Sequence, residues 1–220
     1  MSYNAFAEFY DGLTGNVEYK DRAEYIEKLI KSFGREAGTT LDLACGTGSL
    51  TLELYRRGFD IFGVDASIDM LSEAQQKCSE DEQILFICQK MQRLNLASEI
   101  DTCICTLDSI NHLTNPKDVK ETFKRVAKYL SKDGLFIFDV NTLYKHREVL
   151  CDNCFVFDTD EVFCSWQNEL DKETDIVNIT LDFFIPDENG LYFRETEEFS
   201  ERAYSCLLYT SPSPRDTERS

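Results

Sequence analysis

Short apolar runs alternate with amphipathic segments through the first two thirds of the chain. The apolar runs predict buried strands at residues 39–44, 60–64, 84–88, 102–107 and 135–140. Apolar positions spaced three and four apart, bounded by capping and breaking residues, predict helices at residues 19–33, 49–57, 67–77 and 115–130. Such alternation indicates a parallel sheet covered on both faces. We therefore expect an α/β fold with a Rossmann-like, doubly wound, mainly parallel sheet.

The helix that starts at residues 115–116 has the clearest start signal, because Pro116 suits the first helical position. Its inward face is expected to carry Val119, Phe123, Ala127 and Leu130. A turn at residues 133–134 then leads into the apolar strand 135–140.

The pattern changes after about residue 150. Segments 155–170, 175–186 and 191–204 alternate apolar with polar residues, which is typical of antiparallel strands with one solvated face. A turn is expected at residues 187–190. We expect residues 1–150 to form the core with an N-terminal helical cover, and residues 151–205 to form an antiparallel β insertion that acts as a lid or substrate platform.

Glycines follow the first predicted strand, in the segment 41–48. They let a ligand approach the backbone closely beside a helix N-terminus. Seventeen residues after Gly48, Asp65 ends the second strand, where a carboxylate can accept hydrogen bonds from both ribose hydroxyls. A nicotinamide-dependent oxidoreductase would share both features, but Thr51 stands where its fingerprint needs a third glycine. The sequence therefore predicts a nucleoside-binding site.

Segments 2–19, 41–71 and 105–113 together resemble the class I S-adenosylmethionine-dependent methyltransferases, in particular a small Firmicutes-type group. The resemblance extends over nearly all of residues 1–205. It implies that the chain binds S-adenosylmethionine and transfers its methyl group to an unidentified acceptor, a small molecule or a protein. A non-catalytic scaffold that keeps only the fold, and the oxidoreductase, remain as alternatives.

The resemblance also implies which residues bind the cofactor. They are Tyr10, Asp42, Ala44, Gly46, Asp65, Ala66, Met70, Met91 and Leu107. Among them, Asp42 and Gly46 would face the methionine part, and Ala44, in place of a more usual glycine, would line the turn. Asp65 would hold the ribose.

Further roles follow from the same resemblance. Ala66 and Met70 would border the adenine, although Met70 on an apolar helix face also suits plain core packing. Tyr10, with Tyr19 beside it, would close over the methionine end. Leu107 would lie near the sulfonium.

One departure from the family pattern lies at Lys90, where an acidic residue would bind the adenine amino group. Lysine cannot accept that hydrogen bond, so only backbone contacts near Met91 would remain. No catalytic residue is assigned, because a general base is needed only when the nucleophile arrives protonated. Candidates near the strand ends are Asp108, His112, Asp139 and, for orientation only, Asn141.

The formal net charge of −18 disfavours nucleic acid as a partner, since phosphate binding needs a basic surface. No stretch approaches the roughly 18 apolar residues of a membrane span, and the N-terminal segment lacks an export signal. We therefore expect a cytoplasmic protein, and the sequence leaves its oligomeric state open.

The nine cysteines fit buried, reduced side chains in such a compartment. The sharpest alternative is a zinc site from His146, Cys151, Cys154 and Cys164, but a single CxxC pair is weak support. We expect no metal.

The segment 206–216, CLLYTSPSPRD, reads as a translated sequencing adapter, and the last four residues as its continuation. We therefore expect the native sequence to stop near Ser205. The family sheet usually has seven strands, so we also expect its C-terminal strands to be missing.

Overall fold

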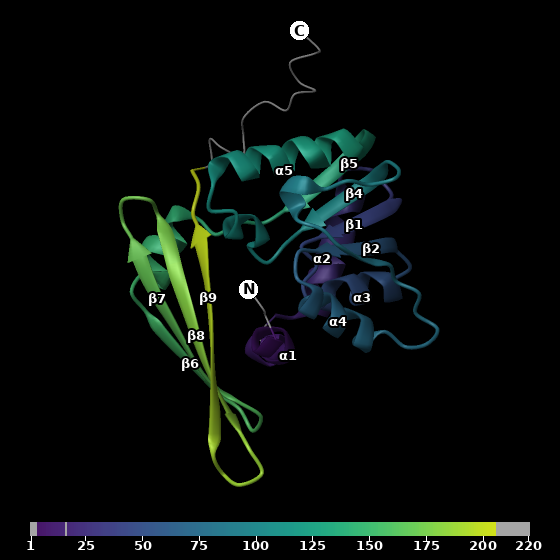
Figure 1. The fold of residues 1–220 in the computed structure, drawn as a ribbon. Helices are drawn as coiled ribbons and strands as arrows, with labels where there is room; N and C mark the ends of the chain where they lie inside the picture. The colour runs from purple at the N-terminus through teal and green to yellow at the C-terminus, as the bar shows by residue number, and fades with distance from the viewer. Residues whose placement is uncertain (1–3, 16, 206–220) are drawn as a thin grey trace.

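The computed structural model describes residues 4–15 and 17–205, which fold around two sheets (Figure 1). The first sheet is parallel, with strand order β3-β2-β1-β4-β5. Its strands are β1 Thr39–Leu43, β2 Asp60–Asp65, β3 Phe86–Cys88, β4 Ile100–Cys105 and β5 Leu130–Phe138. The order reverses at β1, because β2 and β3 extend the sheet on one side and β4 and β5 on the other. The expected doubly wound sheet is confirmed.

Helices pack on both faces of this sheet. They are α2 Tyr19–Ser32, α3 Ser49–Arg56, α4 Ile68–Lys77 and α5 Pro116–Tyr129, whereas α1 Asn4–Leu13 packs on α4 and on the second sheet. On one face, Leu54 of α3 shares a buried cluster with Ile104 of β4. On the other face, Val126 of α5 shares a second buried cluster with residues of β1. Ser67 caps α4, because its hydroxyl accepts the N–H of Met70 at 3.2 Å. None of the described helices has the length and apolar content needed to cross a membrane.

The buried face of α5 differs from the expected one. Its buried residues are Val119, Thr122, Val126 and Tyr129, whereas Phe123 and Ala127 are only half-buried and Leu130 already begins β5. A polar Thr122 fits this face because its hydroxyl donates to the carbonyl of Asp118 at 2.9 Å within the same helix. The spacing of the apolar residues therefore predicted a buried face of α5 that is rotated slightly from the observed one.

The strand β5 also starts earlier than expected. It begins at Leu130 and passes through Asp133, whose φ is 73°, with a shift of register opposite residues 100–102 of β4. At Gly134, a Cβ atom would lie 2.9 Å from the carbonyl oxygen of Asp101. The turn expected at residues 133–134 is thus a bulge inside the strand.

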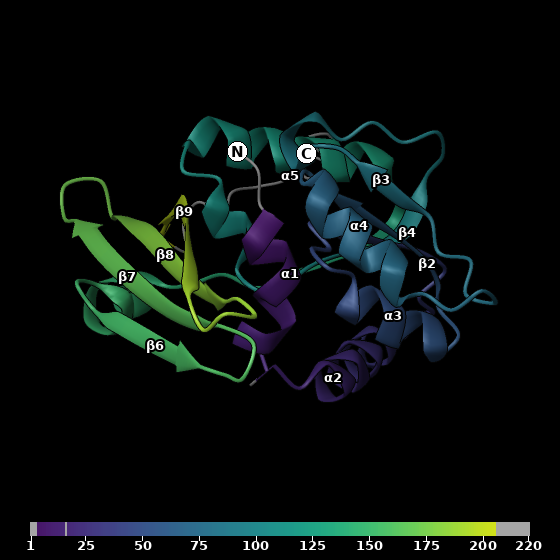
Figure 2. The same ribbon diagram turned by 60° about the horizontal axis from the view of Figure 1, so that its bottom comes forward.

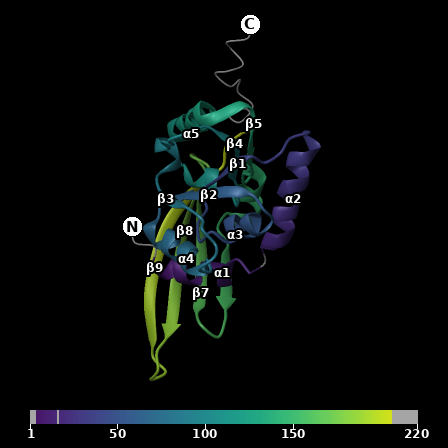
Figure 3. The ribbon, with the colours of Figure 1, turned by 90° about the vertical axis from the view of Figure 1, so that its right-hand side faces the viewer.

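The second sheet is antiparallel, with order β6-β7-β8-β9. Its strands are β6 Cys154–Asp158, β7 Phe163–Asp171, β8 Ile176–Pro186 and β9 Tyr192–Arg202. The first expected segment is two strands, because the N–H of Thr159 donates to the carbonyl of Val162 at 3.1 Å and closes a tight turn. The turn at residues 187–190 is confirmed, with Gly190 at a φ of 78°. Figure 3 shows β8 and β9 reaching away from the parallel sheet as a long hairpin.

The helix α1 lies between the two sheets (Figure 2). Phe6 stacks on Phe199 of β9 with ring centroids 5.6 Å apart, and Phe9 stacks on Phe183 of β8 at 6.2 Å. Met70 of α4 belongs to the same buried cluster. Because full burial of such a side chain contributes about 1.5–3 kcal/mol, these contacts hold α1 against both α4 and the antiparallel sheet.

Candidate active site

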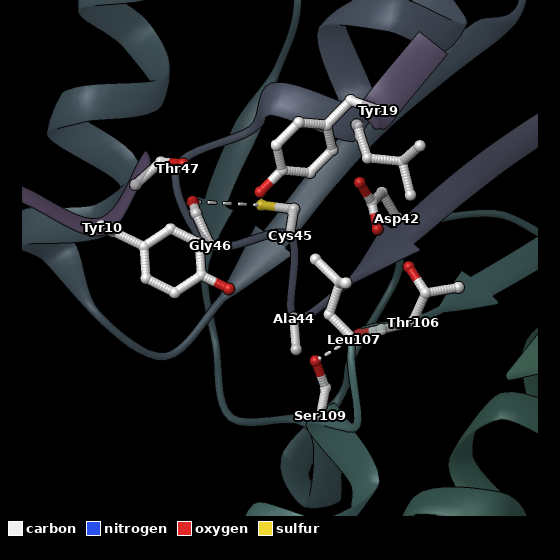
Figure 4. Close-up of a pocket in the computed structure, with 11 residues that line it drawn as sticks. Tyr10, Tyr19, Asp42, Ala44, Cys45, Gly46, Thr47, Thr106, Leu107 and Ser109 are labelled. Carbon is white, nitrogen blue, oxygen red and sulfur yellow. Dashed lines mark hydrogen bonds between the residues drawn. The ribbon is translucent and has the colours of Figure 1, made fainter. Parts of the chain in front are cut away.

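A pocket opens where the order of the parallel sheet reverses. The loops after β1 and β4 diverge there, which is the usual place for a ligand in an open α/β sheet. The pocket holds about 340 Å³ of empty space, open solvent included. Figure 4 shows its lining: Tyr10, Tyr19, Asp42, Ala44, Cys45, Gly46, Thr47, Leu50, Thr106, Leu107 and Ser109. Residues from α1, from α2 and from both loops therefore meet at one point.

The glycine loop after β1 is built from left-handed backbone. Gly46 has a φ of 54°, and a Cβ atom placed on it would meet nothing within 4 Å, so the space beside it is free for a ligand. Gly48, at a φ of 70°, begins α3, and a Cβ atom there would lie 2.8 Å from that of Ala74. Gly46 therefore leaves room for a ligand, and Gly48 lets α3 pack closely on α4.

Ala44 in this loop has a φ of 61°, where its Cβ atom costs about 1 kcal/mol relative to glycine. We expect Ala44→Gly to raise the free energy of unfolding by about 0.5–1 kcal/mol, the relief of strain exceeding the added entropy of the unfolded chain. Urea unfolding followed by circular dichroism measures this change. As a control, Ala97→Gly, in an exposed loop where φ is not positive, should lower stability slightly. A loss of stability in both variants would show that Ala44 is not strained.

Asp65 at the end of β2 connects two loops. One carboxylate oxygen accepts the N–H of Gly46 at 2.9 Å, and the other accepts the N–H of Ser67 at 2.8 Å. Burial raises the pKa of Asp65, and these backbone hydrogen bonds partly oppose the rise. Each oxygen keeps a second lone pair, so the carboxylate can still accept hydrogen bonds from a ligand.

Asp42 is buried under the pocket, with 3% of its surface exposed. Its carboxylate accepts the hydroxyl of Thr51 at 2.6 Å, and no described cation pairs with it. Burial, with a smaller contribution from the charge of Asp65, raises the pKa of Asp42 to about 6. Sequence reasoning missed this role of Thr51, although the residue stood out at the position of the absent third glycine.

Asp11 joins α1 to the glycine loop. Its carboxylate accepts the hydroxyls of Thr47 at 2.8 Å and Ser49 at 3.2 Å, and it pairs with Lys77 of α4. The sequence did not single out Asp11, and its place directly after Tyr10 was the one available signal. Through these contacts, α1 is fixed over the pocket.

The loop after β4 is held in an uncommon conformation. Leu107 and Asp108 have φ values of 57° and 53°, which are rare for residues with side chains and are typical of functional sites. The carboxylate of Asp139 accepts the N–H of Leu107 at 3.1 Å and that of Asp108 at 2.7 Å, and it pairs with Arg22 at 2.8 Å. Asp139, a candidate base in the sequence, thus stabilises this turn.

The predicted cofactor residues divide into two groups. The pocket brings together five of them: Tyr10, Asp42, Ala44, Gly46 and Leu107. The other four lie outside the lining, although Asp65 among them is hydrogen-bonded to Gly46. Ala66 is exposed beside Asp65, Met70 is buried beneath α1, and Met91 is half-buried against the core of the parallel sheet.

The cysteines provide no metal centre in the described part of the chain. His146 and Cys164 are buried, and Cys151 and Cys154 are more exposed. No three His, Cys, Asp or Glu residues among those described could together hold a metal ion.

Comparisons with known proteins show the family of this chain. Residues 40–134 match the family model of the methyltransferase domain. Over 211 residues the chain is 35% identical to the putative methyltransferase YqeM of Bacillus subtilis (strain 168), an alignment covering 95% of this chain and 83% of the relative. The chain belongs to the class I S-adenosylmethionine-dependent methyltransferases. It therefore uses S-adenosylmethionine. The family excludes the two alternatives, a nicotinamide-dependent oxidoreductase and a non-catalytic scaffold.

Two further proteins are similar to this methyltransferase. The crystal structure of an S-adenosylmethionine-dependent methyltransferase from Clostridium acetobutylicum ATCC 824 is 37% identical, with a TM-score of 0.81. The match covers 99% of this chain and 85% of that one. Glycine/sarcosine N-methyltransferase of Aphanothece halophytica is 30% identical over 138 residues, which cover 61% of this chain and 51% of that protein.

The adapter-like residues 206–220 lie outside the described residues.

The residues of the pocket fit the cofactor. Gly46 leaves open space beside the backbone, Asp65 has free lone pairs for hydroxyl groups, and buried Asp42 supplies a negative charge without a cationic partner among the described residues. S-adenosylmethionine has ribose hydroxyls and a positively charged amino group that match these three features.

Proposed function

We propose that this methyltransferase acts on a small-molecule acceptor that binds between the carboxyl edge of the parallel sheet and the antiparallel sheet. The observation that carries the proposal is the position of the pocket, at the reversal of strand order and beneath α1 (Figure 2). Because α1 and β9 cover this edge, a small molecule fits better than a folded protein. The net charge of −18 argues against nucleic acid.

Within this proposal, Asp65 binds the ribose, and Asp42 with Gly46 faces the methionine part. Ala44 lines the turn, and Tyr10 closes over the ligand. Ala66, Met70 and Met91 follow β2 and β3 and would border the adenine, while Leu107 would lie near the sulfonium. Residues 1–150 act as the cofactor-binding core and residues 151–205 as the substrate platform. The eight cysteines within the described residues are free, which supports a cytoplasmic location.

S-adenosylmethionine supplies an electrophilic methyl group when bound. The residues of the chain then need to bind, orient and exclude water, and positioning alone can supply several kcal/mol of the barrier. The left-handed turn at Leu107 and Asp108, fixed by Asp139, places the end of β4 against the pocket. Tyr10 and Tyr19 would shield the reacting atoms from solvent.

Calorimetric titration with S-adenosylmethionine, S-adenosylhomocysteine and NAD tests the cofactor site. We expect the first two to bind with one site per chain and NAD to show no binding. Equal affinity for NAD would contradict the proposed placement. Methyl transfer to a protein fraction but to no small molecule would contradict the proposed acceptor.

The contacts of Asp11 predict a role in retaining the cofactor. We expect Asp11→Asn to weaken S-adenosylmethionine binding about fivefold, equivalent to about 1 kcal/mol, because it loosens α1 from Thr47, Ser49 and Lys77. The change should lie in the dissociation rate, measured by stopped-flow fluorescence. Glu8→Gln, an exposed change on the same helix, is the matched control. Equal dissociation rates in all three proteins would show that α1 does not retain the ligand.

A further inference from the structure

A polar cluster joins the two sheets beside the pocket. Asn141, which follows β5 and is 6% exposed, donates one amide hydrogen to Asp108 and the other to Glu201 of β9 at 3.1 Å. Asn141 is itself fixed by Asn111, whose side-chain oxygen accepts its N–H at 2.8 Å and whose amide donates to its carbonyl at 3.1 Å. A neutral, rigidly held amide therefore bridges two carboxylates from different sheets.

The basic groups nearest to the two carboxylates among the described residues lie at 3.5–4.0 Å. The ammonium of Lys145 is 4.0 Å from Asp108, and Nε2 of His112 is 3.9 Å from Glu201. Glu201 is only 4% exposed; burial opposes its charge, but contacts with His146, His112 and Asn141 lower its pKa overall. Burial and the charge of Glu201 raise the pKa of Asp108. Asp108 is therefore the member of the cluster whose negative charge a ligand could compensate.

A second observation is independent of the carboxylates. His146 is completely buried, and neither of its ring nitrogens makes a hydrogen bond to a described residue. Its Nε2 faces Glu201 at 3.5 Å, beyond good hydrogen-bond geometry. Buried polar groups nearly always have a partner, so this side chain marks an incomplete polar site.

The cluster lies next to the reacting end of the cofactor pocket. Asp108 stands between Leu107 and Ser109, which both line the pocket. The ring of His112 packs against Phe199 of β9 with centroids 5.3 Å apart. Phe6 stacks on the same Phe199 ring at 5.6 Å, so aromatic packing fixes the strand β9 beside the cluster.

We propose that the acceptor of this methyltransferase is an amine, whose ammonium group binds beside the amide of Asn141, at the carboxylate oxygens of Asp108 and Glu201 that do not accept from Asn141. This inference rests on the proposed function and names the substrate class of the same site. The bound ammonium releases one proton to the carboxylate of Asp108. Its nitrogen lone pair then forms the bond to the methyl carbon, and the electrons of the breaking sulfur–carbon bond stay on sulfur, which becomes neutral. The proton leaves Asp108 to solvent, because this side chain is partly exposed.

Matched acceptor pairs that differ only in an amino or a hydroxyl group test the inference. Initial rates are measured with ethanolamine against ethylene glycol, glycine against glycolate, and glucosamine against glucose. We expect at least one amine to react with a kcat/KM at least about tenfold above that of its partner, the scale of a charge-assisted hydrogen bond. Reaction with no amine, or equal reaction with the hydroxyl partner, overturns the inference. Failure to bind S-adenosylmethionine would instead overturn the cofactor site of the proposed function.

Asp108→Asn tests the residue itself. Asparagine tolerates the left-handed conformation at this position, so the variant should fold. We expect the KM of the reactive amine to rise at least about tenfold, with S-adenosylmethionine affinity within about twofold of the wild type. The acid limb of kcat/KM, set by ionisation of Asp108 among Lys145, His112, His146 and Glu201, should disappear. Glu201→Gln should raise the same KM, and exposed Glu80→Gln should leave it unchanged. An unchanged KM and acid limb in Asp108→Asn would show that the cluster only joins the two sheets.

Discussion

Replacing Asp65 with alanine should weaken S-adenosylmethionine binding at least about thirtyfold. The loss corresponds to about 2 kcal/mol, the scale of hydrogen bonds to a charged group. In the proposed complex, the carboxylate accepts ribose hydroxyls while it holds the N–H groups of Gly46 and Ser67. The substitution therefore removes a ligand contact and loosens the glycine loop. Isothermal titration calorimetry measures the affinity.

Two controls separate these effects. Asp65→Asn keeps an acceptor oxygen for the backbone and removes the charge, so its loss of affinity should be intermediate. Asp60→Ala removes an exposed carboxylate from the opposite end of the same strand and should leave binding unchanged. Unaltered affinity in a folded Asp65→Ala variant would place the ribose elsewhere.

The parallel core could be predicted because its signals are local. Strand β1 is an apolar run ended by the glycine loop, and β2 is one ended by Asp65. Their bounds differ from the expected ones by one residue. The β5 bulge had no such signal, because Asp133 looks like an ordinary turn residue. Its conformation depends on the neighbouring strand, where Gly134 lies against the carbonyl of Asp101.

The residues of the site also differ in how well the sequence predicts them. Asp42 and Gly46 lie within one motif, so their proximity followed from spacing alone. Asp11, Asp139 and Glu201 are brought in by tertiary packing, at sequence separations that no motif spans. Asp139, for example, reaches Arg22 across 117 residues. Sequence reasoning therefore identified the glycine loop that lines the pocket but missed most of the residues that hold the pocket together.

Asp42→Asn should make the ligand-free protein more stable and the enzyme a weaker cofactor binder. The carboxyl of Asp42 has a pKa of about 6 in the folded chain against an ordinary value of 3.8. Between about pH 4 and pH 6, the native state holds a proton that the unfolded state has lost. Stability contributed by this group therefore falls as the pH rises through that window. The rise of this pKa from 3.8 to about 6 corresponds to about 3 kcal/mol, which the wild type loses fully above pH 6.

Asparagine stays neutral at every pH and can still accept the hydroxyl of Thr51. We therefore expect Asp42→Asn to raise the free energy of unfolding by about 2–3 kcal/mol at pH 7.5, and the gain to vanish near pH 4. Urea unfolding at both pH values measures this difference. Asp60→Asn, an exposed change in β2, should shift stability by less than about 0.5 kcal/mol.

The same substitution should weaken S-adenosylmethionine binding, because the buried carboxylate would no longer offer a negative charge to the amino group of the methionine part. Stability and affinity should thus move in opposite directions, as expected of a charge kept in a buried site for a ligand. A variant that gains stability without losing affinity would place the methionine part away from Asp42. One that gains no stability at pH 7.5 would show that Asp42 is ionised at little cost, and that the Thr51 hydroxyl is sufficient to stabilise its charge.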